Sequence, residues 1–177
     1  AVLGMMWWLN LFNFMDGIDG LAATEAISVL VMASILIYFQ TSTSLTDYST
    51  EQALMILLAV SLLGFLGANW APAKIFMGDV GSTFLGFVMG MLALMTLTAG
   101  SLNLWVWLIL PGVFWIDATV TLMRRMLRGD RWYQGHRSHA YQRVSRLLEG
   151  SAGQNNLRHA AHRKVTSGIL AINVCWL

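Results

Sequence analysis

The chain has 177 residues, of which 56% are hydrophobic and only 11% are charged. Soluble domains carry charges on about a quarter of their residues, so this composition excludes an ordinary water-soluble domain and favours a membrane protein. The single cysteine, Cys175, excludes a disulfide within the chain and gives no support to a zinc–thiolate site.

The formal net charge of +2 conceals two regions of opposite sign. Segment 124–164 holds ten of the eleven basic residues, all four histidines and only two acids, which gives it a formal charge of +8. The rest of the chain has one base and seven acids, a charge of −6. Such a separation indicates membrane topology, an anionic partner, or both.

Long apolar runs predict an all-α, polytopic transmembrane helical bundle. A bilayer core of about 30 Å requires about 20 helical residues, and in lipid only a helix satisfies its own backbone within one segment. Full spans are predicted over 21–40, 51–70 and 102–123, a shorter one over 83–99, and partial ones over 1–12 and 165–177. The chain opens and closes inside apolar runs and shows no signal peptide, so we interpret it as a fragment of a longer membrane protein.

The basic segment orients these spans. The positive-inside rule places 124–164 in the cytoplasm, and counting back along the spans places 69–82 and 13–20 on the same side. The connection 41–50, on the opposite side, contains no basic residue. The three segments that carry reactive side chains are therefore expected to meet at one cytoplasmic face.

The first of these segments ends a predicted span with two aspartates and two glycines. Asp16 and Asp19 are spaced i, i+3, so on a helical turn they project from one side. One interpretation is helix punctuation by caps and turns. The other is a carboxylate pair that holds a divalent cation or a substrate, since acids at a membrane boundary are costly unless they are paired or functional.

The second segment, 69–82, leads directly into a span. Gly78 and Gly81 allow close backbone approach, and a helix N-terminus offers free N–H groups to a phosphate. Asp79 is suited to Mg²⁺, which prefers carboxylate and phosphate oxygens, and Lys74 is suited to a phosphate. A simple capped helix start explains the same residues without a ligand.

The third segment is basic and interleaves His136, Arg137 and His139 with aromatic residues. Arginine and histidine together suit a diphosphate. The alternatives are a topogenic segment that meets anionic lipid headgroups, and a zinc site formed by the four histidines; nucleic acid is not an expected partner. Within the last full span, Asp117 lies two helical turns before Arg124, which predicts a structural ion pair between them.

Three motifs in this order resemble a known family. They are the asparagine- and aspartate-rich run 10–21, the run Pro72–Ser82 and the basic His/Arg run 131–142. Together they resemble the polyprenyl-phosphate N-acetylhexosamine-1-phosphate transferases, the WecA/MraY superfamily or glycosyltransferase family 4. The resemblance covers essentially the whole chain. It implies an enzyme of ten or eleven spans in the bacterial inner membrane, with its active site facing the cytoplasm.

The resemblance also implies substrates, a cofactor and residue roles. The reaction would pass a sugar 1-phosphate from a UDP-N-acetyl sugar to undecaprenyl phosphate, release UMP, and require Mg²⁺ or Mn²⁺. Asp79 and Asp16 match metal-binding and cleft-lining aspartates, and His136 joins them as a catalytic residue. Asn69, Asp19 and Phe76 match positions that hold the uracil. The full set of implied substrate-binding residues is Asn13, Asp19, Asn69, Lys74, Phe76, Gly78, Arg137 and His139.

Several alternatives stay open at this point. The run 131–142 favours the O-antigen and lipopolysaccharide branch, but the muramoyl-pentapeptide branch of peptidoglycan synthesis is not excluded, nor is a membrane transporter. Family members carry an Asp-Asp pair on an earlier cytoplasmic loop that this chain lacks, so the chain alone is expected to be inactive. A homodimer is compatible with the resemblance.

Overall fold

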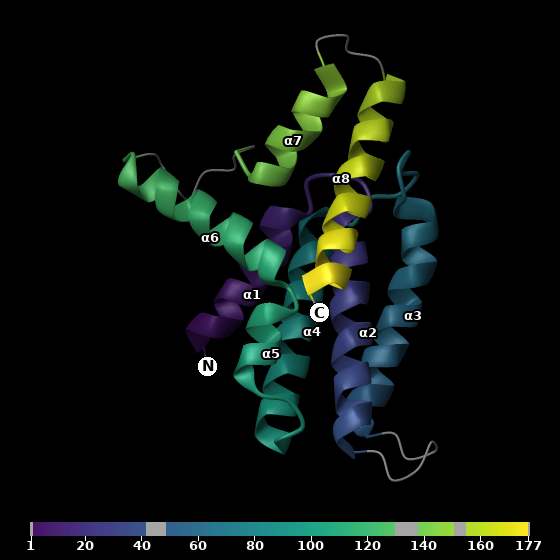
Figure 1. Cartoon of the computed structure of the whole chain (residues 1–177), viewed down its shortest axis with the longest axis vertical. Helices are drawn as coiled ribbons and strands as arrows, with labels where there is room; N and C mark the ends of the chain where they lie inside the picture. Colours follow the sequence, from purple (N-terminus) through teal and green to yellow (C-terminus); the bar gives the residue numbers. More distant parts are fainter. Residues whose placement is uncertain (1, 42–48, 130–137, 151–154, 177) are drawn as a thin grey trace.

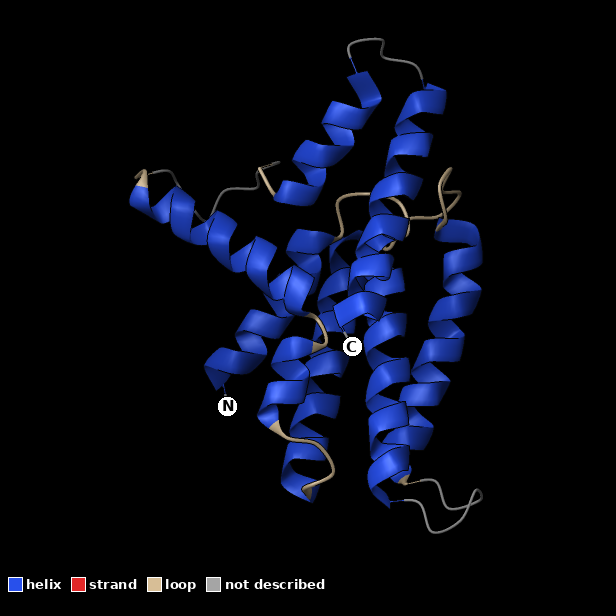
Figure 2. Cartoon of the chain, in the orientation of Figure 1, coloured by secondary structure: helices blue, strands red, loops and turns tan. Residues whose placement is uncertain are grey.

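The computed structural model describes residues 2–41, 49–129, 138–150 and 155–176, and in this part of the chain every regular element is a helix (Figures 1 and 2). The helices are α1 (Val2–Met15), α2 (Leu21–Thr41), α3 (Thr50–Asn69), α4 (Gly78–Ala99), α5 (Leu104–Ile109), α6 (Gly112–Leu127), α7 (Ala140–Glu149) and α8 (Asn155–Trp176). The predicted all-α class is confirmed.

Three helices, α2, α3 and α4, are long and apolar enough to cross a membrane. Helices α2 and α3 pack side by side as an antiparallel pair (Figure 1). The outer face of α3 exposes Leu57, Val60 and Leu63 by 64%, 60% and 52%, as expected for side chains that meet lipid rather than protein. These helices confirm a polytopic membrane protein, although α4 begins at Gly78, five residues before the predicted span 83–99.

Helices α1 and α4 are in close backbone contact. A Cβ atom added at Gly86 would lie only 2.5 Å from the carbonyl oxygen of Trp8, so the helices approach where α4 has no side chain. The amide of Asn13 donates a hydrogen bond to the hydroxyl of Ser82 (3.2 Å). This packing brings the C-terminal end of α1 to the N-terminal end of α4.

The stretch 102–123, predicted as a full span, is not a single helix. The structure divides this stretch into α5 and α6, with the break at Leu110 and Pro111. Proline has no N–H to donate to the preceding turn and its ring clashes with that turn's carbonyl, which ends the helix. The second helix, α6, leans away from the bundle (Figure 1).

The predicted cytoplasmic segment 124–164 contains the end of α6, all of α7 and the first turns of α8. Helices α7 and α8 pack against each other, and α8 also contacts α2. Deep in the bundle, Asn173 of α8 donates a hydrogen bond to the carboxylate of Glu25 in α2. Helix α8 therefore connects the basic segment to the membrane-spanning helices.

Candidate functional site

Two carboxylates lie where the C-terminal end of α1 meets the N-terminal end of α4. Asp16 directly follows the last residue of α1, and Asp79 lies in the first turn of α4. Burial raises the pKa of Asp16 to about 7, and repulsion from Asp79 adds to the rise. Two carboxylates that repel each other form a site where a bound cation would be stabilised.

The donor chemistry of Asp16 and Asp79 is compatible with a magnesium or manganese ion. Within the described ranges, no three His, Cys, Asp or Glu residues are grouped so that they could hold a metal. Mg²⁺ commonly takes only one or two carboxylates and completes its shell with substrate phosphates and water. The N-terminus of α4 adds backbone N–H groups, because its cap residue, Met77, makes no side-chain capping hydrogen bond.

The loop between α3 and α4 presents the remaining predicted ligands of that segment. Lys74 is exposed, and the ring of Phe76 is 75% exposed, so each is accessible to a ligand. Gly78 has a φ of +67°, a conformation that other residues adopt with strain, and it turns the chain into α4.

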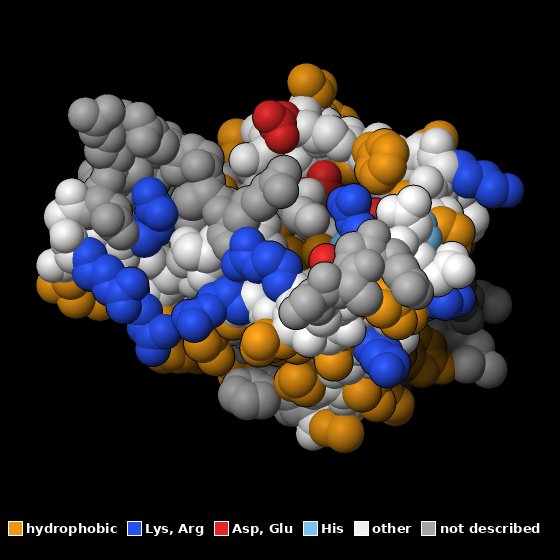
Figure 3. Space-filling view, turned by 90° about the horizontal axis from the view of Figure 1, so that it is seen from above, with side chains coloured by type: hydrophobic (Ala, Val, Ile, Leu, Met, Phe, Trp, Pro, Cys, Tyr) orange, Lys and Arg blue, Asp and Glu red, His pale blue; other side chains and the backbone are white. Residues whose placement is uncertain are grey.

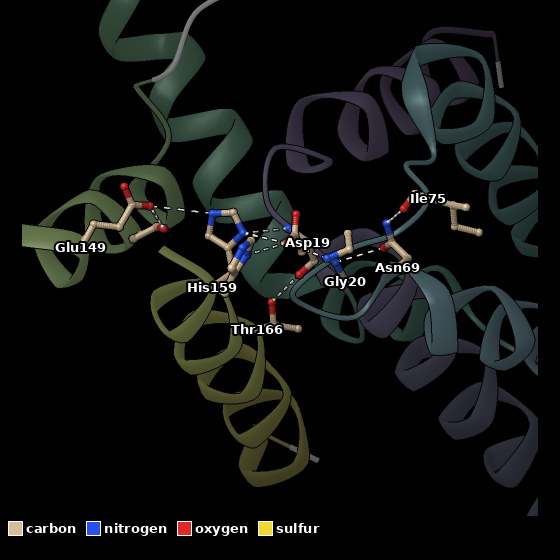
Figure 4. Close-up of polar contacts among 10 residues, drawn as sticks. Asp19, Gly20, Asn69, Ile75, Glu149, His159 and Thr166 are labelled. Atoms are coloured by element: carbon tan, nitrogen blue, oxygen red, sulfur yellow. Dashed lines mark hydrogen bonds and ion pairs between the residues drawn. The ribbon is translucent and has the colours of Figure 1, made fainter. Parts of the chain in front are cut away.

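Asn69 and Asp19 fix the shape of this loop (Figure 4). The buried Asn69 side chain accepts a hydrogen bond from the main-chain N–H of Gly20 (3.0 Å) and donates one to the carbonyl of Ile75 (2.9 Å). Asp19 Oδ2 accepts a hydrogen bond from the main-chain N–H of Ala73 (3.2 Å). Both residues, predicted to bind substrate, therefore hold the turn after α1 against the α3–α4 loop.

Two histidines of α8 complete the surroundings of Asp19. His162 Nδ1 lies 3.3 Å from Asp19 Oδ2, and His159 Nδ1 lies 3.7 Å from the same oxygen. The hydroxyl of Thr166 donates a hydrogen bond to the Asp19 carbonyl (3.2 Å), and His162 Nε2 lies 3.8 Å from Glu149 Oε1. The i, i+3 spacing of the two histidines was visible in the sequence, but there it supported only the zinc alternative.

His139 contacts a third carboxylate, Asp117. It is 2% exposed, stacks on Phe14 and Tyr141, and places Nδ1 3.6 Å from Asp117 Oδ1. The Tyr141 hydroxyl donates a hydrogen bond to the Phe14 carbonyl (3.0 Å), and burial raises the pKa of that phenol. In this structure His139 is the N-cap residue of α7 and its ring is buried against Phe14 and Tyr141, whereas the resemblance implies that it faces a diphosphate.

The predicted ion pair between Asp117 and Arg124 is wrong. Asp117 instead accepts hydrogen bonds from the main-chain N–H groups of Ala140 (2.8 Å) and Tyr141 (3.2 Å), and from the Thr121 hydroxyl (3.1 Å). A carboxylate at the first turn of a helix satisfies free N–H groups and opposes the positive end of the helix dipole. Asp117 therefore attaches α7 to α6.

The structure thus joins the predicted residues into two neighbouring groups. Asn13, Asp16 and Asp79 meet at the α1–α4 contact, while Asp19 and Asn69 hold the adjoining loop. His136 and Arg137 lie outside the described residues. The arrangement defines a polytopic, all-α membrane protein with a cation-compatible carboxylate pair at one end of its helices.

Sequence comparison places this architecture in a family. The profile of glycosyl transferase family 4 matches residues 1–97, and the chain belongs to that family. One relative is the Bacillus subtilis protein named "Probable undecaprenyl-phosphate N-acetylglucosaminyl 1-phosphate transferase", 34% identical over 81% of this chain and 39% of the relative.

Relatives of a second kind carry the name phospho-N-acetylmuramoyl-pentapeptide-transferase. The one from Staphylococcus saprophyticus is 37% identical over 64% of this chain and 32% of its own length, and the one from Clostridium beijerinckii is 44% identical over 49% and 24%. The chain thus spans well under half the length of these relatives. Both kinds of transferase match, so the comparisons identify the family and leave the sugar open.

Proposed function

We propose that the protein containing this chain transfers an N-acetylhexosamine 1-phosphate from a UDP-sugar to undecaprenyl phosphate and releases UMP. The observation that carries the proposal is that the hydrogen bond between Asn13 and Ser82 joins the end of α1, which Asp16 follows, to the first turns of α4, which carry Asp79. Membership of glycosyl transferase family 4 and the printed names of the relatives support the same reaction.

The chemistry of the step suits this arrangement. An oxygen of the lipid phosphate attacks the β-phosphorus of the UDP-sugar, a P–O bond forms, and the bond from the β-phosphorus to the bridging oxygen breaks. UMP leaves with that oxygen and its electron pair. Transfer between two anions depends on neutralised charge and in-line positioning more than on covalent catalysis.

The residues of this chain contribute in distinct ways. Asp16 and Asp79 would hold a Mg²⁺ or Mn²⁺ ion, which offsets the charge of the diphosphate when bound. The uncapped N–H groups of α4 and the exposed Lys74 add positive potential for the phosphates. The exposed ring of Phe76 offers a stacking surface for a uracil, on a loop that Asn69 and Asp19 hold in shape.

The same proposal includes location and branch. The excess of basic residues in 124–164 supports an active site at the cytoplasmic face of the bacterial inner membrane. The run 131–142 supports a lipid-linked envelope glycan of the O-antigen type as the product. Transfer of a muramoyl-pentapeptide phosphate is the second candidate, because relatives with that name match the chain.

The test is UMP release by the full-length protein in membranes. It is assayed with undecaprenyl phosphate, Mg²⁺ and a panel of UDP-N-acetyl sugars that includes the muramoyl-pentapeptide donor. We expect release that depends on lipid and metal and falls at least about a hundredfold in Asp79→Asn, because a carboxylate on the metal bears directly on transition-state charge. Asp47→Asn, in the connection 41–50, is the matched control and should retain activity.

Each outcome of the UMP-release assay tests a separate part of the proposal. The donor that releases UMP assigns the branch. Release that Asp79→Asn leaves unchanged would remove Asp79 from the metal role. If the folded protein released no UMP from any donor, the proposed transferase activity would be rejected and a membrane transporter would become the favoured interpretation.

A further inference from the structure

A cavity of about 670 Å³ lies between α6, α7 and α8. Neither Asp16 nor Asp79 lines this cavity. Its walls are mainly apolar and include Val120 of α6, Val144 of α7 and Ile169 of α8. Cavities of this size are typical of binding sites for small amphiphilic molecules. Among the described residues that line it, none is one of the metal- or substrate-binding residues that the family resemblance implies.

Each of the three helices contributes one basic side chain to this cavity. These are Arg124, Arg143 and Lys164, all exposed, and none forms an ion pair with an acid in the described part of the chain. The one acid that lines the cavity, Asp117, is occupied by hydrogen bonds from the α7 N-terminus. The described lining therefore combines apolar walls with three basic side chains and one carboxylate, a formal net charge of +2.

Lys164 lies close to the end of a membrane-spanning helix. Lys164 is two residues from Thr166, which hydrogen-bonds the Asp19 carbonyl in the turn where α1 ends and α2 begins. That turn marks the end of the span formed by α2. Figure 3, which views this end of the molecule, shows arginine and lysine side chains in a row along one edge beside hydrophobic side chains. A binding site at the end of a membrane span can hold a lipid headgroup on its cytoplasmic side and acyl chains on its membrane side.

Tyr141 separates the cavity from the carboxylate pair. Its side chain lines the cavity and is 4% exposed, while its hydroxyl bonds the Phe14 carbonyl. That hydroxyl would lie 2.2 Å from a Cβ added at Gly17, beside Asp16. Tyr141 therefore contacts both the cavity and the turn that carries Asp16, which favours a structural lipid in the cavity over the reacting lipid phosphate.

We propose that this cavity binds an anionic phospholipid of the surrounding membrane, such as phosphatidylglycerol or cardiolipin. The headgroup phosphate is held by Arg124, Arg143 and Lys164, and an acyl chain lies against the apolar walls. Basic pockets between membrane helices on the cytoplasmic side bind such headgroups. The bound lipid joins three helices that carry Asp117, His139 and His162, and so stabilises the arrangement around Asp19.

The experiment is native mass spectrometry of the full-length protein purified in a neutral detergent. Phosphatidylglycerol, phosphatidylcholine and undecaprenyl phosphate are added separately and in competition. We expect one phosphatidylglycerol to be retained in preference to phosphatidylcholine. Its binding should fall about tenfold or more in the double variant Arg143→Gln/Lys164→Gln, since each basic residue contributes about 1 kcal/mol near an anionic surface.

A second variant blocks the cavity instead of its charge. Gly168 lines the cavity and has nothing within 4 Å of an added Cβ, so Gly168→Leu fills space without a clash. We expect it to abolish lipid retention. The matched controls are Gly64→Leu, at an equally open glycine of α3, and Arg163→Gln, one residue before Lys164 and outside the cavity. Both should retain the lipid.

Three results would overturn the proposal. They are equal retention of phosphatidylcholine, retention unaffected by the double charge variant, or displacement of phosphatidylglycerol by one equivalent of undecaprenyl phosphate, which would assign the cavity to the substrate lipid. Thermal unfolding without added lipid identifies any variant that fails to fold. If Gly168→Leu fails to fold, lipid retention by the Arg143→Gln/Lys164→Gln variant is the deciding measurement. The readout is lipid mass, so it is independent of UMP release.

Discussion

His162 Nδ1 and Asp19 Oδ2 lie 3.3 Å apart although 143 residues separate them in the chain. The main-chain N–H of Asp19 also donates to the same histidine nitrogen (3.4 Å). This nitrogen therefore faces both a donor and an acceptor, and either protonation state of the ring finds a partner. The contact holds α8 against the turn that carries Asp16.

The first prediction concerns this contact. His162→Ala should lower the free energy of unfolding by about 1–3 kcal/mol, because it removes a buried polar partner of Asp19. His162→Asn should restore most of the loss, since an amide nitrogen can occupy the place of Nδ1. Thermal unfolding of the purified full-length protein measures both. His159→Ala is the control: that side chain is 32% exposed and more distant, and an equal loss there would contradict the assignment.

Asn69 allows a second prediction. Asn69→Asp keeps the acceptor for the Gly20 N–H but places an oxygen against the Ile75 carbonyl, where the amide now donates. The expected cost is about 1–3 kcal/mol of unfolding free energy. The exposed Asn156→Asp should be near neutral. If Asn69→Asp raised the KM for the UDP-sugar with unchanged stability, direct substrate binding would replace the structural role.

The contact of α1 with α4 is tested at Gly86. A methyl group there would lie 2.5 Å from the Trp8 carbonyl oxygen, which backbone atoms cannot avoid without moving a helix. Gly86→Ala should destabilise by about 1–3 kcal/mol and should lower transferase activity, because it shifts Asp79 relative to Asp16. Gly64→Ala in α3 meets open space and should not destabilise the protein, since alanine has the higher helix propensity by up to about 1 kcal/mol. An equal loss of stability from both substitutions would show that the close contact at Gly86 is not the cause.

Asp117 gives the fourth prediction. Asp117→Ala should cost about 1–2 kcal/mol and expose the Ala140 and Tyr141 amides to faster hydrogen exchange, since their acceptor is lost. Arg124→Gln, measured without added anionic lipid, should change the free energy of unfolding by less than about 0.5 kcal/mol. A large loss from Arg124→Gln would restore the ion pair that the sequence suggested.

Much of the fold could be predicted because its signals are local. Span length and apolar composition over 21–40 and 51–70 identified α2 and α3 within one or two residues. The break at Pro111 could also have been predicted from the proline, but the span 102–123 was predicted from its length and mainly apolar composition. Helix α7 was missed because a +8 segment was interpreted through its charge, not through its strongly amphipathic pattern.

The candidate site could likewise be predicted only in part from the sequence. The sequence alone determined that Asp16 and Asp79 belong to segments expected at one membrane face, because residue charge sets topology without reference to packing. Only the tertiary structure decided that Asn69 bonds two main-chain groups, that Asp117 receives the α7 N-terminus and that His162 meets Asp19. Those contacts depend on the way helices distant in sequence pack together, and the residues alone do not specify that packing.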